Sequence, residues 1–128
     1  MRVFGIGIDV VEVARIAAAI ERHGEAFLAR LFTAAERGYC ESRHIPAPCY
    51  AARFAAKEAV SKALGTGIGR HASWLDLEIV HDSNGAPQLV LGPTAAAFAT
   101  AHGVTDIKIS LTHTRHYAAA NAIAISNQ

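Results

Sequence analysis

The amino-acid sequence predicts an α+β domain in which a mostly antiparallel sheet packs against a long central helix. Helical patterns gather in the first half of the chain, whereas alternating patterns and a hairpin signal dominate the second half. The length of 128 residues amounts to one domain, so residues 1–128 are treated as a single unit. A hydrophobic content of 52% with only 18% charged residues supplies a core without the charge excess of a disordered chain.

The first predicted strand covers residues 3–10, where successive side chains fall on opposite faces. One face carries the large apolar side chains of Phe4, Ile6, Ile8 and Val10. The other face carries Val3, Gly5, Gly7 and Asp9. A helix is expected to follow over residues 11–23, with Gly24 suited to end it.

Two further helices are predicted before the middle of the chain. Thr33 and Glu36 have the spacing of a capping box, so a short helix is expected to begin there. Proline interrupts it at Pro46, and Pro48 suits the first turn of a new helix. This long helix is predicted to run over 48–64 and to stop at the glycine-rich segment 65–67.

The second half of the chain predicts strands and one more helix. Residues 75–80 alternate between apolar and polar positions, and Asn84 and Gly85 then form a turn before a partner strand at 88–91. The remaining predicted elements are an alanine-rich helix at 93–102 and two strands at 107–112 and 117–126. This order of elements favours an α+β arrangement with antiparallel pairing.

The charge balance excludes several classes of protein. With 12 Lys and Arg against 11 Asp and Glu, the net charge is +1, which disfavours a general nucleic-acid binder. No apolar run reaches the roughly 18 residues of a membrane span, and no signal peptide is visible, so we expect a cytoplasmic protein with no membrane partner. The spacing of Cys40 and Cys49 matches no zinc or redox motif, and free thiols are expected.

The long predicted helix separates its apolar stripe from a polar group. The stripe consists of Ala52, Ala56, Ala59, Val60 and Ala63. Glu58 and Lys62 lie one turn apart on the other side, flanked by Ser61, and form a candidate acid and base pair. The alternative is an ordinary helix-stabilising pair, which is worth only about 0.3–0.5 kcal/mol.

The first strand offers a second candidate carboxylate. Asp9 shares its face with two glycines, and glycine in a strand often marks the close approach of a ligand or of another backbone. A carboxylate beside open space is suited to hydrated Mg²⁺, which accepts one or two carboxylates together with phosphate oxygens. The alternative is that Asp9 caps the helix that follows. Val10 occupies the position where a dinucleotide-binding fingerprint needs a small residue, so that interpretation fails.

Other chemistries find no support in the sequence. The seven histidines lack zinc-hydrolase spacing, and no nucleophile motif is present. Arginines on the predicted helices, at Arg15, Arg30, Arg37 and Arg43, are individually expected to be solvated surface charges. Together they could form a basic face for an acidic protein partner.

Three sequence blocks resemble the 4′-phosphopantetheinyl transferases, most closely the small holo-acyl-carrier-protein synthase branch of that family. The first is Gly5-Ile-Gly-Ile-Asp9, and the most specific is the segment from Phe54 to Gly67, in which Lys57-Glu58-Ala59 and Lys62 are embedded. The third is Ser110-Leu-Thr-His113, where threonine replaces a usual serine. The resemblance spans residues 4–125, which is nearly the whole chain.

The resemblance implies a trimer-forming α+β fold with an active site in each cleft between neighbouring subunits of a homotrimer. It implies coenzyme A as the donor, Mg²⁺ as the metal and a serine of apo-acyl carrier protein as the acceptor. The products would be holo-carrier protein, for use in fatty acid biosynthesis, and adenosine 3′,5′-bisphosphate.

Residue roles also follow from the resemblance. Asp9 and Glu58 would hold Mg²⁺ against the coenzyme A pyrophosphate, with Lys62 in contact with the phosphate and Gly65 letting backbone approach the ligand. The nucleotide contacts would be His113, with Arg53 and His44 as candidates for the same region. The carrier protein would dock at Arg15. Glu58 is also the candidate acceptor of the serine proton, directly or through water.

Two rival functions remain. An actin-like or sugar-kinase ATPase would use the first block as a phosphate loop, but such folds need two large lobes that 128 residues cannot supply. A non-catalytic trimeric module that binds coenzyme A or a carrier protein would keep the scaffold without the chemistry. Both candidate carboxylates and Lys62 are present, which favours the enzyme.

Overall fold

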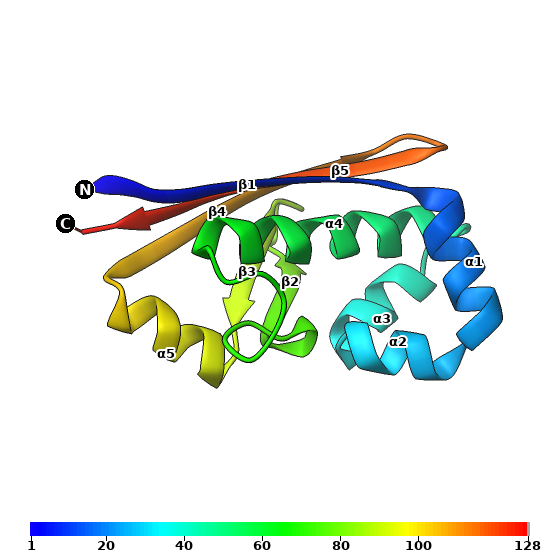
Figure 1. Ribbon diagram of the computed structural model, residues 1–128. Helices are drawn as coiled ribbons and strands as arrows, with labels where there is room; N and C mark the ends of the chain where they lie inside the picture. The colour runs from blue at the N-terminus through cyan, green and yellow to red at the C-terminus, as the bar shows by residue number, and fades with distance from the viewer. Residues whose placement is uncertain (128) are drawn as a thin grey trace.

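The computed structural model describes residues 1–127 as a helix-and-strand fold whose strands all pair antiparallel within those residues (Figure 1). In chain order the elements are β1 (Arg2–Glu12), α1 (Val13–His23), α2 (Glu25–Leu31), α3 (Ala34–Glu41), α4 (Ala47–Leu64), the 3₁₀ turn η1 (Trp74–Asp76), β2 (Leu77–His81), β3 (Pro87–Leu91), α5 (Pro93–Ala101), β4 (Val104–His113) and β5 (Tyr117–Ser126). The predicted α+β class with an antiparallel sheet is confirmed. Within the described residues, no helix has the length and apolar character that crossing a membrane requires.

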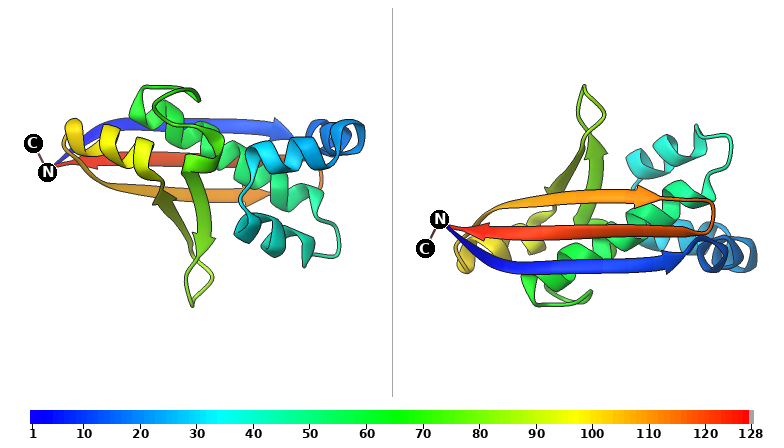
Figure 2. Two further views of the ribbon diagram at one scale, coloured as in Figure 1. Left: turned by 90° about the horizontal axis from the view of Figure 1, so that it is seen from below. Right: turned by 90° about the horizontal axis from the view of Figure 1, so that it is seen from above.

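The main sheet has three strands in the order β1-β5-β4, so the last strand of the chain lies in the middle (Figure 2). Arg2 pairs with Ser126, which brings both ends of the described chain to one end of the sheet. The β2–β3 hairpin forms a separate two-stranded sheet. Helix α4 runs along one face of the main sheet, with α1, α2 and α3 gathered at one end and α5 near the other (Figure 1).

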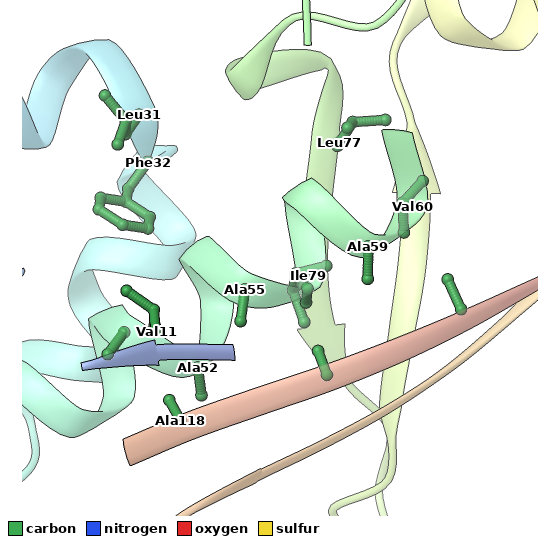
Figure 3. Packing of buried hydrophobic residues seen from close by; sticks show 14 of the residues in the cluster. Val11, Leu31, Phe32, Ala52, Ala55, Ala59, Val60, Leu77, Ile79 and Ala118 are labelled. Atoms are coloured by element: carbon green, nitrogen blue, oxygen red, sulfur yellow. The ribbon is translucent and has the colours of Figure 1, made fainter. Parts of the chain in front are cut away.

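Small residues let α4 lie close to the sheet. The face of α4 toward β1 and β5 is built largely of buried alanines, and β5 meets it with alanines of its own (Figure 3). A Cβ added at Gly5 would lie 2.0 Å from the carbonyl oxygen of Ala63, and one at Gly7 would lie 1.8 Å from that of Ala59. Both distances are far below van der Waals contact, so only glycine permits this approach. The glycines therefore make room for the helix backbone rather than for a ligand.

The opposite face of the main sheet is not covered by any helix (Figure 2), and its row of side chains along β1 is apolar. Ile6, Ile8 and Val10 of β1 are 70%, 64% and 62% exposed, and Ile123 of β5 lies directly opposite Ile6. Because side chains alternate along β1, its glycines face the helix and its large apolar side chains face solvent. Contiguous exposed apolar surface of this kind marks an interaction site.

The structure corrects three details of the sequence-based expectations at the start of the chain. Strand β1 continues to Glu12, because Val11 pairs with Ala118 and buries its side chain, so the helix begins only at Val13. Helix α2 was not predicted, since its seven residues are too few to show a clear period. It begins after Gly24, whose φ of 53° turns the chain between α1 and α2.

Two side chains near α4 also differ from expectation. Ser61 is fully buried and donates to the carbonyl of Glu58, so it does not belong to the exposed polar group. Cys40 and Cys49 form a disulfide with their Cα atoms 5.4 Å apart, which overturns the expectation of free thiols. The expectation was wrong because the α3–α4 connection folds back and brings the end of one helix against the start of the next. The capping box at Thr33 and Glu36 is confirmed.

Candidate active site

The structure brings Asp9 of β1 against Lys62 of α4. The Lys62 ammonium donates to the Asp9 carboxylate at 3.2 Å and to the Ile8 carbonyl at 2.8 Å. The lysine is exposed, whereas Asp9 is half-buried at the strand position that follows the two glycines. The close packing of β1 on α4 is therefore what carries these side chains, 53 positions apart, into contact.

Glu58 joins this pair from one helical turn before Lys62. Partial burial is the main reason that the pKa of Glu58 is raised above its ordinary value, and the negative charge of Asp9 raises it further while Lys62 opposes the shift. The three predicted catalytic residues thus form one electrostatically coupled group. The three side chains lie together where β1 packs on α4.

Both structural alternatives for these carboxylates fail. Within residues 1–127, Lys62 forms its ion pair with Asp9 and not with Glu58, so the simple pair within α4 is absent. Helix α1 has Glu12 at its N-cap with no side-chain hydrogen bond to cap it, so Asp9 does not cap that helix.

The donor set is suited to a hard cation. Two carboxylates of separate elements face the same region, and the described part of the chain has no group of three or more His, Cys, Asp or Glu that could hold a metal alone. Zinc sites need three or four protein ligands. Mg²⁺ retains water and takes one or two carboxylates with substrate phosphates, so the residues fit this ion.

Gly65 ends α4 in the left-handed region with φ 80°, which is why a glycine is needed there. Its amide donates to the Lys62 carbonyl at 3.0 Å, and the amide of Gly67 donates to the Ser61 carbonyl at 3.2 Å. No atom lies within 4 Å of a Cβ placed on Gly65, so the backbone is open on that side. This tight turn therefore leaves exposed backbone immediately after Lys62.

A second feature is a cavity of about 480 Å³ beside the start of α4. Its polar lining comes from several separate elements: Tyr39, Arg43, Arg53, His81, Thr112 and His113. Arg53 and His113, both predicted nucleotide contacts, thus share one cavity. His44 lies on the exposed segment between the lining residues Arg43 and Ile45 and does not itself line the cavity.

Arg53 is the most unusual side chain of this cavity, because it is only 3% exposed. Its Nη1 donates to the Cys49 sulfur at 3.2 Å and its Nη2 to His81 Nδ1 at 3.1 Å, while its Nε has no partner. No carboxylate of the described chain forms an ion pair with it, and burial lowers its pKa. A buried cation without an ion-pair partner favours an anionic ligand.

The predicted basic face is only partly present. Arg15 is exposed on α1, at the end of the molecule away from the chain termini (Figure 1). Arg37 is instead paired with Glu25 at 2.6 Å, and Arg43 lines the cavity.

Sequence reasoning missed a buried ion pair next to these sites. Lys57, the residue before Glu58, points the opposite way into the core and donates to Glu36 at 2.8 Å. The sequence indicates the position of Glu36, at N3 of the predicted capping box, but not its partner Lys57. It also missed Tyr39 and His81 in the cavity, for which no local pattern exists.

The sequence of this chain is similar to the sequences of known proteins. A family model described as the 4′-phosphopantetheinyl transferase superfamily matches residues 5–122. The chain is 49% identical over 121 residues to the holo-[acyl-carrier-protein] synthase of Moorella thermoacetica, covering 94% of this chain and 93% of that protein. It is also 49% identical over 123 residues to the protein of the same name from Desulforudis audaxviator, covering 96% and 93%.

Solved structures show the same fold. The holo-[acyl-carrier-protein] synthase of Neisseria meningitidis superposes with a TM-score of 0.92 at 32% identity, covering 98% of this chain and all of that one. The enzyme of Helicobacter pylori, crystallised in complex with coenzyme A, superposes with a TM-score of 0.84 at 32% identity, covering 94% and 99%.

Proposed function

Since the chain belongs to the 4′-phosphopantetheinyl transferase superfamily, we propose that it transfers 4′-phosphopantetheine from coenzyme A to a serine of apo-acyl carrier protein. The products are holo-carrier protein and adenosine 3′,5′-bisphosphate, and the reaction serves fatty acid biosynthesis in the cytoplasm. The observation that carries the proposal is the convergence of Asp9, Glu58 and Lys62 from two distant segments.

Lys62 and the two carboxylates divide the work of phosphoryl transfer, which asks a protein mainly to position groups and to stabilise charge. Asp9 and Glu58 would hold Mg²⁺, which when bound draws negative charge from the pyrophosphate oxygens. Lys62 places its ammonium where the departing phosphate gains charge. The contact of Lys62 with Asp9 and the Ile8 carbonyl fixes that ammonium beside the carboxylates before the substrate arrives.

Glu58 is the candidate acceptor of the serine proton. Its pKa is raised by burial and by Asp9, which makes it a better proton acceptor than an ordinary carboxylate. The acceptor serine would approach from the solvent side of α4, where Glu58 is only half-buried.

The cavity beside α4 is the proposed site of the nucleotide end of coenzyme A. Arg53 and His113 line it, and His44 lies in the chain between the lining residues Arg43 and Ile45. The Arg53 guanidinium supports a phosphate there, because among the described residues it has no ion-pair partner and its Nε has no hydrogen-bond acceptor.

The assembly proposed for this chain is a homotrimer. The uncovered apolar face of the main sheet, formed by Ile6, Ile8, Val10 and Ile123, supports self-association because its burial would remove large apolar side chains from water. Each active site would then lie in a cleft between neighbouring subunits. Arg15 is the proposed docking contact for the acidic carrier protein, since it is exposed and basic.

The function is tested by incubating the chain with coenzyme A, Mg²⁺ and apo-acyl carrier protein. We expect the carrier protein to gain about 340 Da, the mass of a phosphopantetheine group. Asp9→Asn and Glu58→Gln should each abolish the gain while keeping the fold. Glu25→Gln is the matched control, because Glu25 is an exposed carboxylate that pairs with Arg37 and with no other side chain of residues 1–127.

An unmodified carrier protein with the wild-type chain would reject the transferase. If the unmodified carrier and coenzyme A nevertheless bound the chain, the non-catalytic binding module would be the better account. ATP hydrolysis without transfer would support the kinase-like alternative.

A further inference from the structure

His81 makes the single nitrogen acceptor contact of the buried Arg53 guanidinium among the described residues. Arg53 Nη2 and His81 Nδ1 are 3.1 Å apart. Arginine carries only donors, so Nδ1 of His81 must be an acceptor in this hydrogen bond. The histidine is therefore neutral, with its proton on the other ring nitrogen.

Tyr39 holds both partners from one side. Its ring stacks on the His81 ring at 4.4 Å between centroids and 7° between planes. The Arg53 guanidinium carbon lies 4.4 Å from the same ring centroid. The imidazole and the guanidinium are thus fixed relative to each other by one aromatic ring, at the wall of the cavity.

We propose that His81 is a positioning residue for the anionic end of the nucleotide substrate: in its neutral form it accepts from Arg53 and holds the guanidinium in the orientation that binds phosphate. The identity of the anion rests on the proposed function, whereas the contact itself does not. Arg53 would touch the ligand, and His81 would act only through Arg53.

Protonation of His81 would break this arrangement. A proton on Nδ1 would place an N–H opposite the N–H of Arg53, which removes the acceptor and sets two cations against each other. The charged and titratable groups that face His81 are Arg53 of α4, Tyr39 and Arg43 at the end of α3, His113 of β4 and the adjacent Asp82. Burial and the two arginines lower the pKa of His81, with Asp82 opposing them, so the histidine is neutral at pH 7.

Two substitutions separate the acceptor from the ring. His81→Asn keeps an acceptor oxygen near the position of Nδ1 and does not titrate in this range. His81→Phe keeps a ring against Tyr39 and has no acceptor. At pH 8 we expect His81→Phe to weaken the binding of coenzyme A about tenfold or more, the loss of one hydrogen bond to a charged group, and His81→Asn to stay within about twofold of wild type. In transfer assays the change should fall on KM for coenzyme A rather than on kcat.

The change of nucleotide affinity with pH tests whether the neutral form of His81 is the one that supports binding. The dissociation constant of adenosine 3′,5′-bisphosphate is measured calorimetrically from pH 8 to pH 5 for the wild type and for His81→Asn. The ratio of the wild-type dissociation constant to that of the variant cancels the titration of the ligand phosphates, which is common to both proteins. We expect this ratio to rise at least threefold as the pH falls below about 6. A falling ratio would mean that protonated His81 attracts the phosphate directly, and would overturn the proposal.

The remaining outcomes are equally defined. If His81→Asn, which loses the ring, weakens binding at pH 8 at least as much as His81→Phe does, the acceptor does not account for the role of His81, and the proposal is overturned. A ratio that stays flat with pH would remove the protonation step and would overturn it too. If His81→Phe fails to fold, the ratio for His81→Asn still decides. Absence of nucleotide binding by the wild type would overturn both this proposal and the proposed function, whereas active wild type with a flat ratio overturns only the role of His81.

Discussion

The Lys57 ammonium lies 2.8 Å from the Glu36 carboxylate, and both side chains are fully buried. The same ammonium donates to the Trp74 carbonyl, and Glu36 accepts from the backbone amides of Thr33 and Ile79. One ion pair thus joins α4 to α3, to the 3₁₀ turn and to β2. Residues of α3, α4 and β2 also line the cavity beside the start of α4.

Breaking this pair on one side should be costly. Lys57→Met is expected to lower the free energy of unfolding by about 3–5 kcal/mol, because it leaves the Glu36 charge buried without its partner. The double variant Lys57→Met, Glu36→Leu should lose less than the single variant, since no unpaired charge remains. Urea denaturation of the three proteins measures this, and a double variant less stable than the single one would contradict it.

Glu58→Gln should change stability in a pH-dependent manner. The folded-state pKa of Glu58 is raised, so the folded protein favours the protonated carboxyl and ionisation costs stability as the pH rises. Without Mg²⁺, the variant should therefore melt slightly higher than wild type at pH 7 and equally with it below about pH 4. Added Mg²⁺ should raise the melting temperature of the wild type alone. Scanning calorimetry with and without the ion tests both halves of the prediction, and an equal response to Mg²⁺ would remove Glu58 from the metal site.

Lys62→Met should lower kcat/KM for transfer by about 10²-fold or more, a loss typical of removing a group that stabilises charge in the transition state. Lys62→Arg keeps the charge and should recover part of the activity, but not all of it, because the guanidinium cannot reproduce the compact contact with Asp9 and the Ile8 carbonyl. The exposed lysine contributes little to the core, so the melting temperature should hardly change. Steady-state kinetics of the two variants give the answer, and equal activity of Lys62→Met and wild type would exclude an electrostatic role.

Gly7→Ala should disrupt the contact between β1 and α4. The added methyl group would lie 1.8 Å from the Ala59 carbonyl oxygen, so strand and helix must move apart at a cost of about 3 kcal/mol or more. Gly38→Ala is the matched control, because no atom lies within 4 Å of its Cβ position in α3, and alanine should stabilise that helix by about 0.5–1 kcal/mol. Chemical denaturation compares them. Transfer activity of any folded Gly7→Ala protein should also fall, because Asp9 moves with the strand.

Arg15→Glu should raise KM for the carrier protein about tenfold or more while leaving KM for coenzyme A nearly unchanged. The difference should shrink at high salt, as expected for an exposed charge. Arg2→Glu makes the same charge change at the other end of β1 and should have little effect. Equal rises of both KM values would assign Arg15 to folding or catalysis instead of docking.

The fold was largely predictable because its elements carry strong local signals. The alternation of β1, the capping box at Thr33 and the glycine after α4 each belong to a few consecutive residues. The β1 glycines were correctly singled out, but their partner could not be known, since the Ala59 and Ala63 carbonyls come from the other side of the fold. The disulfide could not be predicted either, because no local spacing rule connects Cys40 with Cys49.

The candidate site was predictable to the extent that its residues lie in specific motifs. Asp9 lies in the first of the three blocks that resemble the family, and Glu58 and Lys62 lie in the second. Their proximity follows from the packing of β1 on α4. The Arg53 and His81 contact joins α4 to β2 across 28 positions, and no period or motif encodes such a distance. The charge of a residue did not predict its burial either. Lys57 and Glu58 are adjacent in sequence, yet Lys57 is buried in the core and Glu58 faces the site.

The glycines of β1 carry a consequence for how the sheet chooses its alignment. A slip of β1 by one residue against β5 would turn Ile6 and Ile8 toward the carbonyl oxygens of α4, where not even a methyl group fits. Steric overlap thus excludes every register of β1 that is shifted by an odd number of residues. Asp9 therefore cannot be placed on the opposite face of the sheet. Gly5 and Gly7, which have no side chains, in this way determine the face on which the Asp9 carboxylate lies.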